Sequence, residues 1–210
     1  MGRVRLVILA TLLAVGSVSM AADRPAVGGV DRVEGAATAS FQHDARALDA
    51  GDAVYFRDLL ATGDEARLQV LLGDGSTLRL GANARLLVDE FVYPPERGLS
   101  RLRLQVPAGA FQFRGGRVEE APRSSVEIRT PAATLGIRGT LVWGGTLDDG
   151  DYGVLVLAGE VEVRNAAGAV VLATGEGTRI SAPGMPPTAA KRWADSLVRQ
   201  AMATVSFPDE

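Results

Sequence analysis

The sequence predicts an all-β protein: a solenoid-like or irregular β-sandwich domain of short strands, followed by a C-terminal amphipathic helix. Apolar and polar side chains alternate through much of residues 30–182, as in strands with one buried face. The 25 glycines indicate many tight turns. Helical spacing of apolar residues is weak before residue 188. With 47% apolar and 22% charged residues, the 210-residue chain can form one globular domain of ordinary size.

Residues 1–21 are predicted to be a cleaved signal peptide. Two arginines near the start precede an apolar stretch over residues 6–15, and Ser19 and Ala21 fit the small residues of a signal-peptidase site. The stretch is too short for a comfortable membrane anchor. We therefore expect an exported, periplasmic protein, cleaved after Ala21 or Ala22, with secretion beyond the periplasm as an open alternative.

The predicted mature chain is acidic. Removing the two arginines of residues 1–21 leaves 20 basic against 25 acidic residues, a net charge of −5. An acidic chain with a single lysine is a poor candidate for nonspecific nucleic-acid binding. No later segment has the roughly 18 consecutive apolar residues of a membrane span, so none is expected after cleavage. Residues 22–29 are interpreted as a flexible lead-in.

The all-β domain is expected over residues 30–182. Its strands are indicated by alternating or continuous apolar residues between turn residues. They centre on Ala66–Leu72, Leu78–Leu80, Ala84–Val88, Leu102–Val106, Phe111–Phe113, Val126–Ile128, Val154–Leu157, Val161–Val163 and Val170–Leu172.

The positions of the apolar residues predict the length of each turn, because an odd or an even number of loop residues decides which side chains share a face. Around Gly73–Ser76, a loop of three or five residues with Gly75 at positive φ puts all the flanking leucines and valines on one face, pairing Leu72 with Leu78. A turn centred on Asp149-Gly150 is expected to pair Leu147 with Tyr152. Both faces of that second hairpin are apolar, which predicts a central hairpin buried on two sides. A third turn is expected at residues 165–168.

The β pattern ends at the Pro/Gly linker of residues 183–187. Thr188 is a plausible N-cap for a helix over residues 188–206, because Trp193, Leu197 and Ala201 follow at helical spacing. This helix is expected to pack back on the β domain. The alternative is a helix that docks a partner.

Two motifs resemble those of the FecR family of bacterial envelope domains. The first is Leu71–Asn83, which contains Asp-Gly-Ser-x-Leu-x-Leu, and the second is Thr130–Thr140, which contains Gly-Ile-Arg-Gly-Thr. The resemblance covers roughly residues 48–147. It implies an all-β, solenoid-like periplasmic domain. In the best-known members this domain senses an outer-membrane siderophore receptor and an attached cytoplasmic anti-sigma segment relays the message.

This chain departs from that arrangement, because a signal peptide is expected where those members carry a cytoplasmic domain and a retained membrane helix. The resemblance therefore indicates a freestanding exported member. The motif residues are interpreted as structural, since prolines mark strand starts and glycines permit bulges. They are Asp74, Gly75, Ser76, Thr130, Pro131, Gly136, Ile137, Arg138, Gly139 and Thr140.

Arg138 has two interpretations. The favoured one is a guanidinium that ties neighbouring turns together through carbonyls or a carboxylate. The other is an exposed bidentate contact for a carboxylate of a partner.

The sequence favours a protein without catalytic activity, cofactor or metal. It has no cysteine, and its single histidine, His43, is expected in a loop. The sequence also has no Gly-x-Ser-x-Gly motif of a serine hydrolase. The acidic pairs at Glu119-Glu120 and Asp148–Asp151 are typical of solvated turns. Catalysis by these acids and calcium binding at Asp148–Asp151 remain minor alternatives.

The leading functional hypothesis is a protein-interaction module of the bacterial cell envelope, accessory to envelope or metal-uptake signalling, with an envelope protein as its partner. Strand edges, through β-augmentation, and a long loop over Val92–Leu99 are the expected contact surfaces. The alternative is a peptidoglycan- or polysaccharide-binding module.

Overall fold

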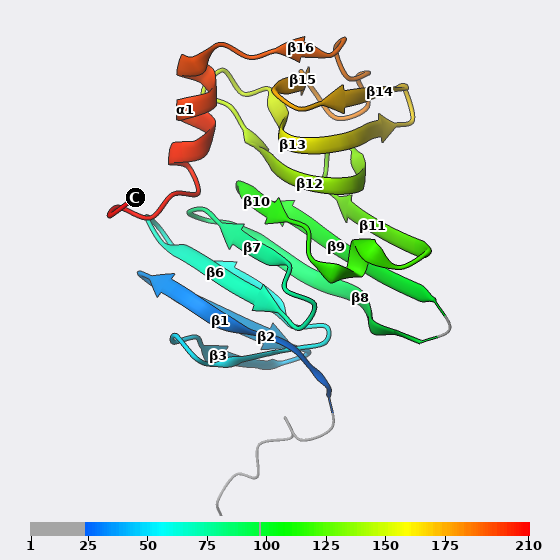
Figure 1. Ribbon diagram of the computed structural model, residues 1–210. Coiled ribbons are helices and arrows are strands. Elements are labelled where there is room, and N and C mark those ends of the chain that lie inside the picture. Colours follow the sequence, from blue (N-terminus) through cyan, green and yellow to red (C-terminus); the bar gives the residue numbers. More distant parts are fainter. Residues whose placement is uncertain (1–23, 97) are drawn as a thin grey trace, which may run out of the picture.

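A computed structural model describes residues 24–96 and 98–210 (Figure 1). The predicted signal peptide lies outside these residues. The protein is all-β with a C-terminal helix, as the sequence predicts. The described strands form one sixteen-stranded sheet that folds over on itself into two halves. Pairing among them is antiparallel, apart from the parallel pair of β9 (Leu99–Ala108) and β11 (Arg123–Arg129).

The two halves of the sheet are continuous runs of neighbouring strands. The first half contains, in spatial order, β3 (Asp44–Ala47), β2 (Ala37–Phe41), β5 (Leu59–Thr62), β8 (Arg85–Glu96), β9 and β11. The second half contains β4 (Ala53–Tyr55), β1 (Ala26–Glu34), β6 (Arg67–Leu72), β7 (Thr77–Leu80) and β10 (Phe111–Arg114).

Two long bent strands join the halves. The first part of β12 (Thr134–Thr146) pairs with β11, and its second part pairs with β10. Similarly, β13 (Tyr152–Asn165) pairs through its first part with β15 (Glu176–Ile180) and through its second part with β14 (Gly168–Ala173). Strands that change sheets at a bend in this way are a feature of β-sandwiches with sharp corners. The fold is thus an irregular sandwich with an apolar core between its halves.

The core follows from alternation along each strand. In β6 the side chains of Leu68, Val70 and Leu72 are buried, and Leu78 and Leu80 of β7 face the same core. They meet apolar residues of the opposite half, such as Leu86 and Leu104. Burial of these side chains is the main stabilising contribution to the fold.

The β6–β7 turn follows the predicted parity with a different register. Gly73–Gly75 form a three-residue loop, Gly75 has φ of 87°, and Leu72 N–H donates to Ser76 O. The shared buried face is confirmed, but Val70 pairs with Leu78 instead of with Leu80. The shorter of the two allowed loops moves the pairing by two residues and so leaves every side chain on its expected face.

The hairpin of β12 and β13 was assigned one residue out of register. Its loop is three residues long, Asp148–Gly150, so Thr146 pairs with Tyr152 and Trp143 with Leu155. Gly150 takes the left-handed conformation at the third loop position, with φ of 90°. Burial on both faces is confirmed, because Val156 belongs to the main core and Trp143 to a second apolar cluster.

The C-terminal helix is shorter than expected. Thr188 is extended rather than an N-cap: its N–H donates to Arg179 O, and its hydroxyl accepts a bond from Arg179 N–H. The chain then forms β16 (Lys191–Arg192) against β15, and α1 spans Asp195–Ala203. The predicted first turn of the helix therefore pairs with the edge of β15 instead.

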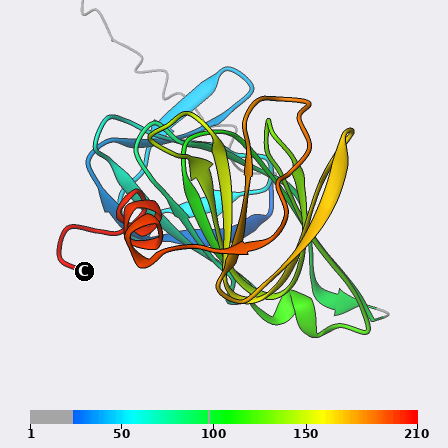
Figure 2. The ribbon, with the colours of Figure 1, turned by 90° about the horizontal axis from the view of Figure 1, so that it is seen from above.

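Helix α1 packs on the β domain, as the favoured interpretation predicts. Ala201 and Val205 join Trp143, Leu155 and Trp193 in the second apolar cluster. Seen from above, α1 lies outside the β domain, on the opposite side of the molecule from β14 (Figure 2). No helix within residues 24–96 and 98–210 is long and apolar enough to cross a membrane.

Two further segments differ from expectation. Strand β1 begins at Ala26, inside the expected flexible lead-in, where it pairs with β4 and β6. The expected long loop at Val92–Leu99 is instead the end of β8 and the start of β9. Pro94 and Pro95 are tolerated there because the ladder shifts register between Val92 and Glu96.

Candidate functional site

The first family motif forms a buried turn that holds a short helix in place. The Asp74 side chain is fully buried and accepts hydrogen bonds from Ser76 N–H at 3.1 Å, the Ser76 hydroxyl at 2.6 Å and Val118 N–H at 3.1 Å. Val118 belongs to the 3₁₀ helix η2 (Arg117–Glu120), and its carbonyl accepts a bond from Ser100 Oγ at 2.7 Å. The Asp-Gly-Ser turn therefore fixes η2, which also contacts β8, β9 and β11.

The second family motif begins with a turn and continues into β12. Thr130 and Ala133 close the turn, with Thr130 N–H and Oγ1–H both donating to Ala133 O at 2.9 Å. Pro131 lies exposed inside the turn, where no ladder donor is needed. Ile137 is buried, whereas Gly136 and Arg138 lie on the outward face of the strand. The side chain of Thr140 lies outside the description.

Gly139 is the corner at which β12 passes from one half of the sheet to the other. It has φ of 62°, and the pairing of β12 with β13 is irregular between Arg138 and Leu141. The matching corner of β13 is Gly159, with φ of 87°, and a Cβ added there would lie 2.0 Å from Gly139 O. A side chain does not fit at Gly159, whereas at Gly139 a Cβ would meet nothing within 4 Å and glycine is favoured only by the positive φ.

Arg138 does not tie neighbouring turns together, so the favoured interpretation of this residue is wrong. Its side chain is exposed and makes no hydrogen bond or ion pair with any described residue. The direct backbone contact of Gly139 with Gly159 replaces the expected guanidinium bridge. The corner instead projects Arg138 outward from the sheet.

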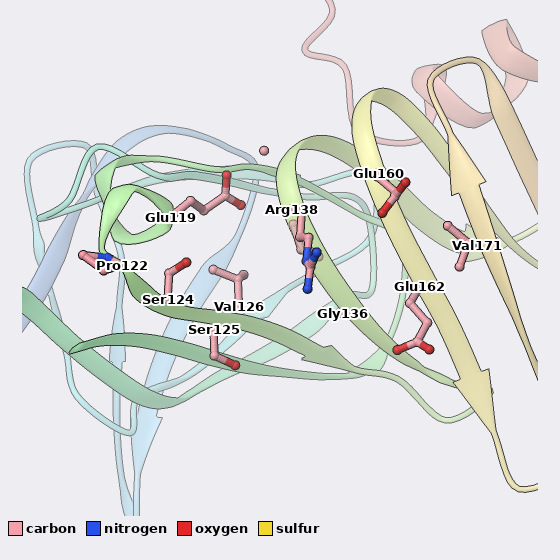
Figure 3. A pocket seen from close by; sticks show the side chains of 12 residues that line it. Glu119, Pro122, Ser124, Ser125, Val126, Gly136, Arg138, Glu160, Glu162 and Val171 are labelled. Atoms are coloured by element: carbon pink, nitrogen blue, oxygen red, sulfur yellow. The ribbon is translucent and has the colours of Figure 1, made fainter. Parts of the chain in front are cut away.

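Arg138 lies in a hollow of about 800 Å³ on the outer face of the sheet. Figure 3 shows its side chain between Glu119 and Ser125 on one side and Glu160 and Glu162 on the other. The register places Glu160 opposite Arg138, and Glu162 opposite Gly136. Gly136 deepens the hollow, because a Cβ there would meet nothing closer than 3.9 Å.

The hollow offers charges of both signs for recognition. Arg138 can donate two parallel hydrogen bonds to a carboxylate or phosphate. The exposed carboxylates Glu160 and Glu162 can accept from cationic side chains, and Ser124 and Ser125 contribute hydroxyls. Its apolar rim is Val171 of β14. No aromatic side chain lines the hollow within the described part of the chain.

Sequence reasoning missed Glu160, Glu162 and Val171. Their signal was present, because Glu160-Val161-Glu162 alternates in a strand whose valine must face the core. The sequence pattern does not predict the register of β13 with β12, which brings the two carboxylates beside Arg138.

Of the other candidates, Glu119 lines this hollow, whereas His43 and the acids of Asp148–Asp151 lie apart from it. His43 is exposed in the turn between β2 and β3. The carboxylates of Asp149 and Asp151 are both held by Arg179, and its hydrogen bond keeps the pKa of Asp149 below the usual range. Across residues 24–96 and 98–210, no three potential ligand side chains gather to hold a metal ion.

The comparisons with known proteins agree with this structure. A sequence model described as FecR protein matches residues 58–162, which include β12 up to its corner, β13 as far as Glu162 and the Asp74 turn. The chain belongs to the FecR family. No curated protein sequence matches the FecR-family chain.

Two solved structures have the same fold as this FecR-family chain. Both are described as a candidate anti-sigma factor from Parabacteroides distasonis ATCC 8503. They match with TM-scores of 0.53 and 0.52 at 19% and 18% sequence identity, over 67% of this chain. The match spans 62% of each of those chains, so the similarity describes a shared fold and leaves more than a third of each of them unmatched.

Proposed function

We propose that this chain is a non-enzymatic protein-interaction domain of the bacterial cell envelope, accessory to signalling and located in the periplasm. Membership of the FecR family supports a signalling-related envelope role. The periplasmic location rests on the signal peptide expected at residues 1–21.

The observation that carries the proposal is the exposed Arg138 at the β12 corner, whose side chain bonds to none of the described residues. An arginine that served only the fold would be expected to bond to carbonyls or carboxylates of its own chain. Here the corner is built from Gly139 and Gly159 backbone, and the guanidinium projects into a hollow of about 800 Å³. A paired strand constrains the backbone of Arg138 more than a loop would, so less backbone entropy is lost on binding.

The charges of the hollow indicate the chemistry of the partner. Arg138 suits an acidic side chain, and Glu160 with Glu162 suits basic ones, so a protein surface with charges of both signs is the complementary ligand. Polysaccharide binding is less well supported, because sugar sites usually offer aromatic platforms and this hollow has none within the described residues.

The test is capture of partners in the cell envelope. A tagged full chain is crosslinked in cells, and co-purifying proteins are identified by mass spectrometry, for the parent, Arg138→Ala and Arg85→Ala. Arg85 is the matched control, since it is an exposed arginine of β8 that bonds to no described side chain. We expect one envelope protein to be enriched by the parent and Arg85→Ala, and lost by Arg138→Ala with an unchanged thermal transition.

Two results would contradict the proposal. Equal capture by all three chains would show that Arg138 does not contact the partner. Sedimentation of the chain with purified cell wall, with no enriched protein, would favour the polysaccharide-binding alternative.

A further inference from the structure

Strand β14 is an open edge of the sheet without the usual protection. Among the described strands it pairs with β13 alone, and Figure 1 shows it at the upper end of the stack. Its sequence, Gly-Ala-Val-Val-Leu-Ala, has no charge and no proline. The other edge strands are short or charged: β4 has three residues, β3 contains Asp44 and Arg46, and β16 is Lys191-Arg192. Natural proteins rarely leave an apolar edge of six residues uncovered.

The backbone of β14 is oriented for pairing. Ala173 N–H points away from β13, because it donates to the Glu176 carboxylate at 2.9 Å. Backbone direction alternates along an antiparallel strand, so the N–H and C=O groups of Val171 and Ala169 also point outward from the edge. Val171 lies at the centre of this edge and is 52% exposed.

We infer that β14 pairs antiparallel with β14 of a second copy of this chain, about a two-fold axis at Val171. This inference goes beyond the proposed function, although Val171 and Glu160 also line the hollow beside Arg138. In this register Val171 lies opposite Val171 of the other copy, and Ala169 lies opposite Ala173 of the other copy. Each of these pairs lies on the outward backbone side, so the two edges can exchange ladder hydrogen bonds when Ala173 N–H exchanges the Glu176 carboxylate for Ala169 O of the other copy.

Two of the three outer rows in this register join opposite charges of the neighbouring strand, whereas the central row places Glu162 beside Val171 in both copies. On the outer face, Glu160 is beside Ala173 and Arg164 is beside Ala169. On either side of the two-fold axis, one row of side chains crosses the joined sheets. It runs from Glu160 and Ala173 of one copy to Ala169 and Arg164 of the other copy. Three strand steps separate the charged residues by about 14 Å between Cα atoms, which extended glutamate and arginine side chains can span above the two alanines. The same row forms twice, once in each direction.

The inner face is also self-complementary. Val170 and Leu172 face the core, beside Val163 and Val161 respectively. The two-fold axis places Val170 against Leu172 of the other copy, so an apolar row continues through the joined sheets. The pairing matches apolar residues on the inner face and opposite charges in the two outer rows that flank the axis, which favours this register.

The first test measures self-association of the purified chain by sedimentation equilibrium. We expect a concentration-dependent dimer, and Val171→Lys is expected to raise its dissociation constant by about tenfold or more, because it places two like charges opposite each other. Leu71→Lys is the matched control: Leu71 is 48% exposed, but on the interior strand β6. It should leave the dissociation constant unchanged.

The second test is a charge exchange. Glu160→Arg alone and Arg164→Glu alone each place like charges in both rows, and both are expected to weaken the dimer. The double variant E160R/R164E restores opposite charges in each row and should restore the dissociation constant. Failure of the double variant to recover would contradict the register.

The third test uses the absence of cysteine from the sequence. A Val171→Cys chain carries one thiol, and the pair at the axis is separated by about 5.5 Å between Cα atoms, within disulfide range. We expect an oxidised dimer from this variant and none from Leu71→Cys. A chain that stays monomeric at all concentrations, or that dimerises equally with Val171→Lys, would overturn the inference. If another protein's strand fills the edge, the chain alone is monomeric, which also overturns it.

Discussion

Replacement of Asp74 by alanine tests whether the first family motif is a tertiary anchor or only a good turn. Asp74 and Asp149 occupy the same middle position of three-residue loops that end in a left-handed glycine. Each also accepts a local bond from the N–H two residues later, at 3.1 Å and 3.3 Å. Asp74 differs in being buried and in binding Val118 of η2. Asp149→Ala is therefore the matched control.

The expected loss follows from the bonds that Asp74 accepts. Removing the carboxylate leaves the N–H groups of Ser76 and Val118 and the Ser76 hydroxyl without their acceptor, in a buried turn. Each unsatisfied buried donor costs about 1–3 kcal/mol, and loss of the buried charge offsets part of this, so we expect Asp74→Ala to destabilise the protein by about 3–5 kcal/mol. In a chain of this size, that lowers Tm by roughly 10 °C.

Urea unfolding followed by tryptophan fluorescence measures this difference. Trp143 and Trp193 are both buried, so unfolding exposes both indoles to water. The free energy of unfolding of Asp149→Ala should stay close to that of the parent, since its loop is exposed. Equal losses in the two variants would refute the reasoning, because the bond to η2 would then contribute nothing beyond the local turn.

Two further predictions concern the corner and the buried phenol. Gly159→Ala should destabilise the fold by about 3 kcal/mol or more, because its Cβ would lie 2.0 Å from a backbone oxygen. Gly150→Ala is the control, with similar φ and open surroundings, and should cost about 1 kcal/mol. Urea titrations measure both losses, and equal unfolding midpoints would contradict the prediction. Burial raises the pKa of the Tyr152 phenol above its usual 10.0. The folded protein should therefore lose stability as the pH rises past the pKa of this phenol in the unfolded chain. Near-ultraviolet absorbance should show Tyr152 ionising only on unfolding. Tyr152→Phe should remove that late step; a single titration of all three tyrosines in the folded protein would disprove it.

Much of the sheet could be predicted because strand alternation is a local property. Leu68, Val70 and Leu72 show their buried face in the sequence itself, and parity alone gave the odd loop at Gly75. The β12–β13 register was missed by one residue, because Asp149-Gly150 also suits a two-residue turn and both faces of that hairpin are apolar. Alternation cannot select a register when either choice buries apolar side chains.

Tertiary pairing explains the other differences. Residues 188–192 were predicted to start the helix, yet this segment bonds to β15 through Thr188 and the strand Lys191–Arg192. The site was hidden for the same reason. The sequence offered Arg138 as one possible partner contact but did not single out Glu160, and only the pairing of β12 with β13 puts the two side by side.

The two family motifs, more than 50 residues apart in the sequence, build opposite sides of one hollow. The Asp74 turn fixes η2, and the Glu119 side chain of η2 forms one wall. The Gly139 corner presents Arg138 from the other side, next to Glu160. A motif kept only for folding would not need an arginine that bonds to nothing within the described chain. The glycines and the buried aspartate account for the shape of the hollow, and Arg138 accounts for what that shape can bind.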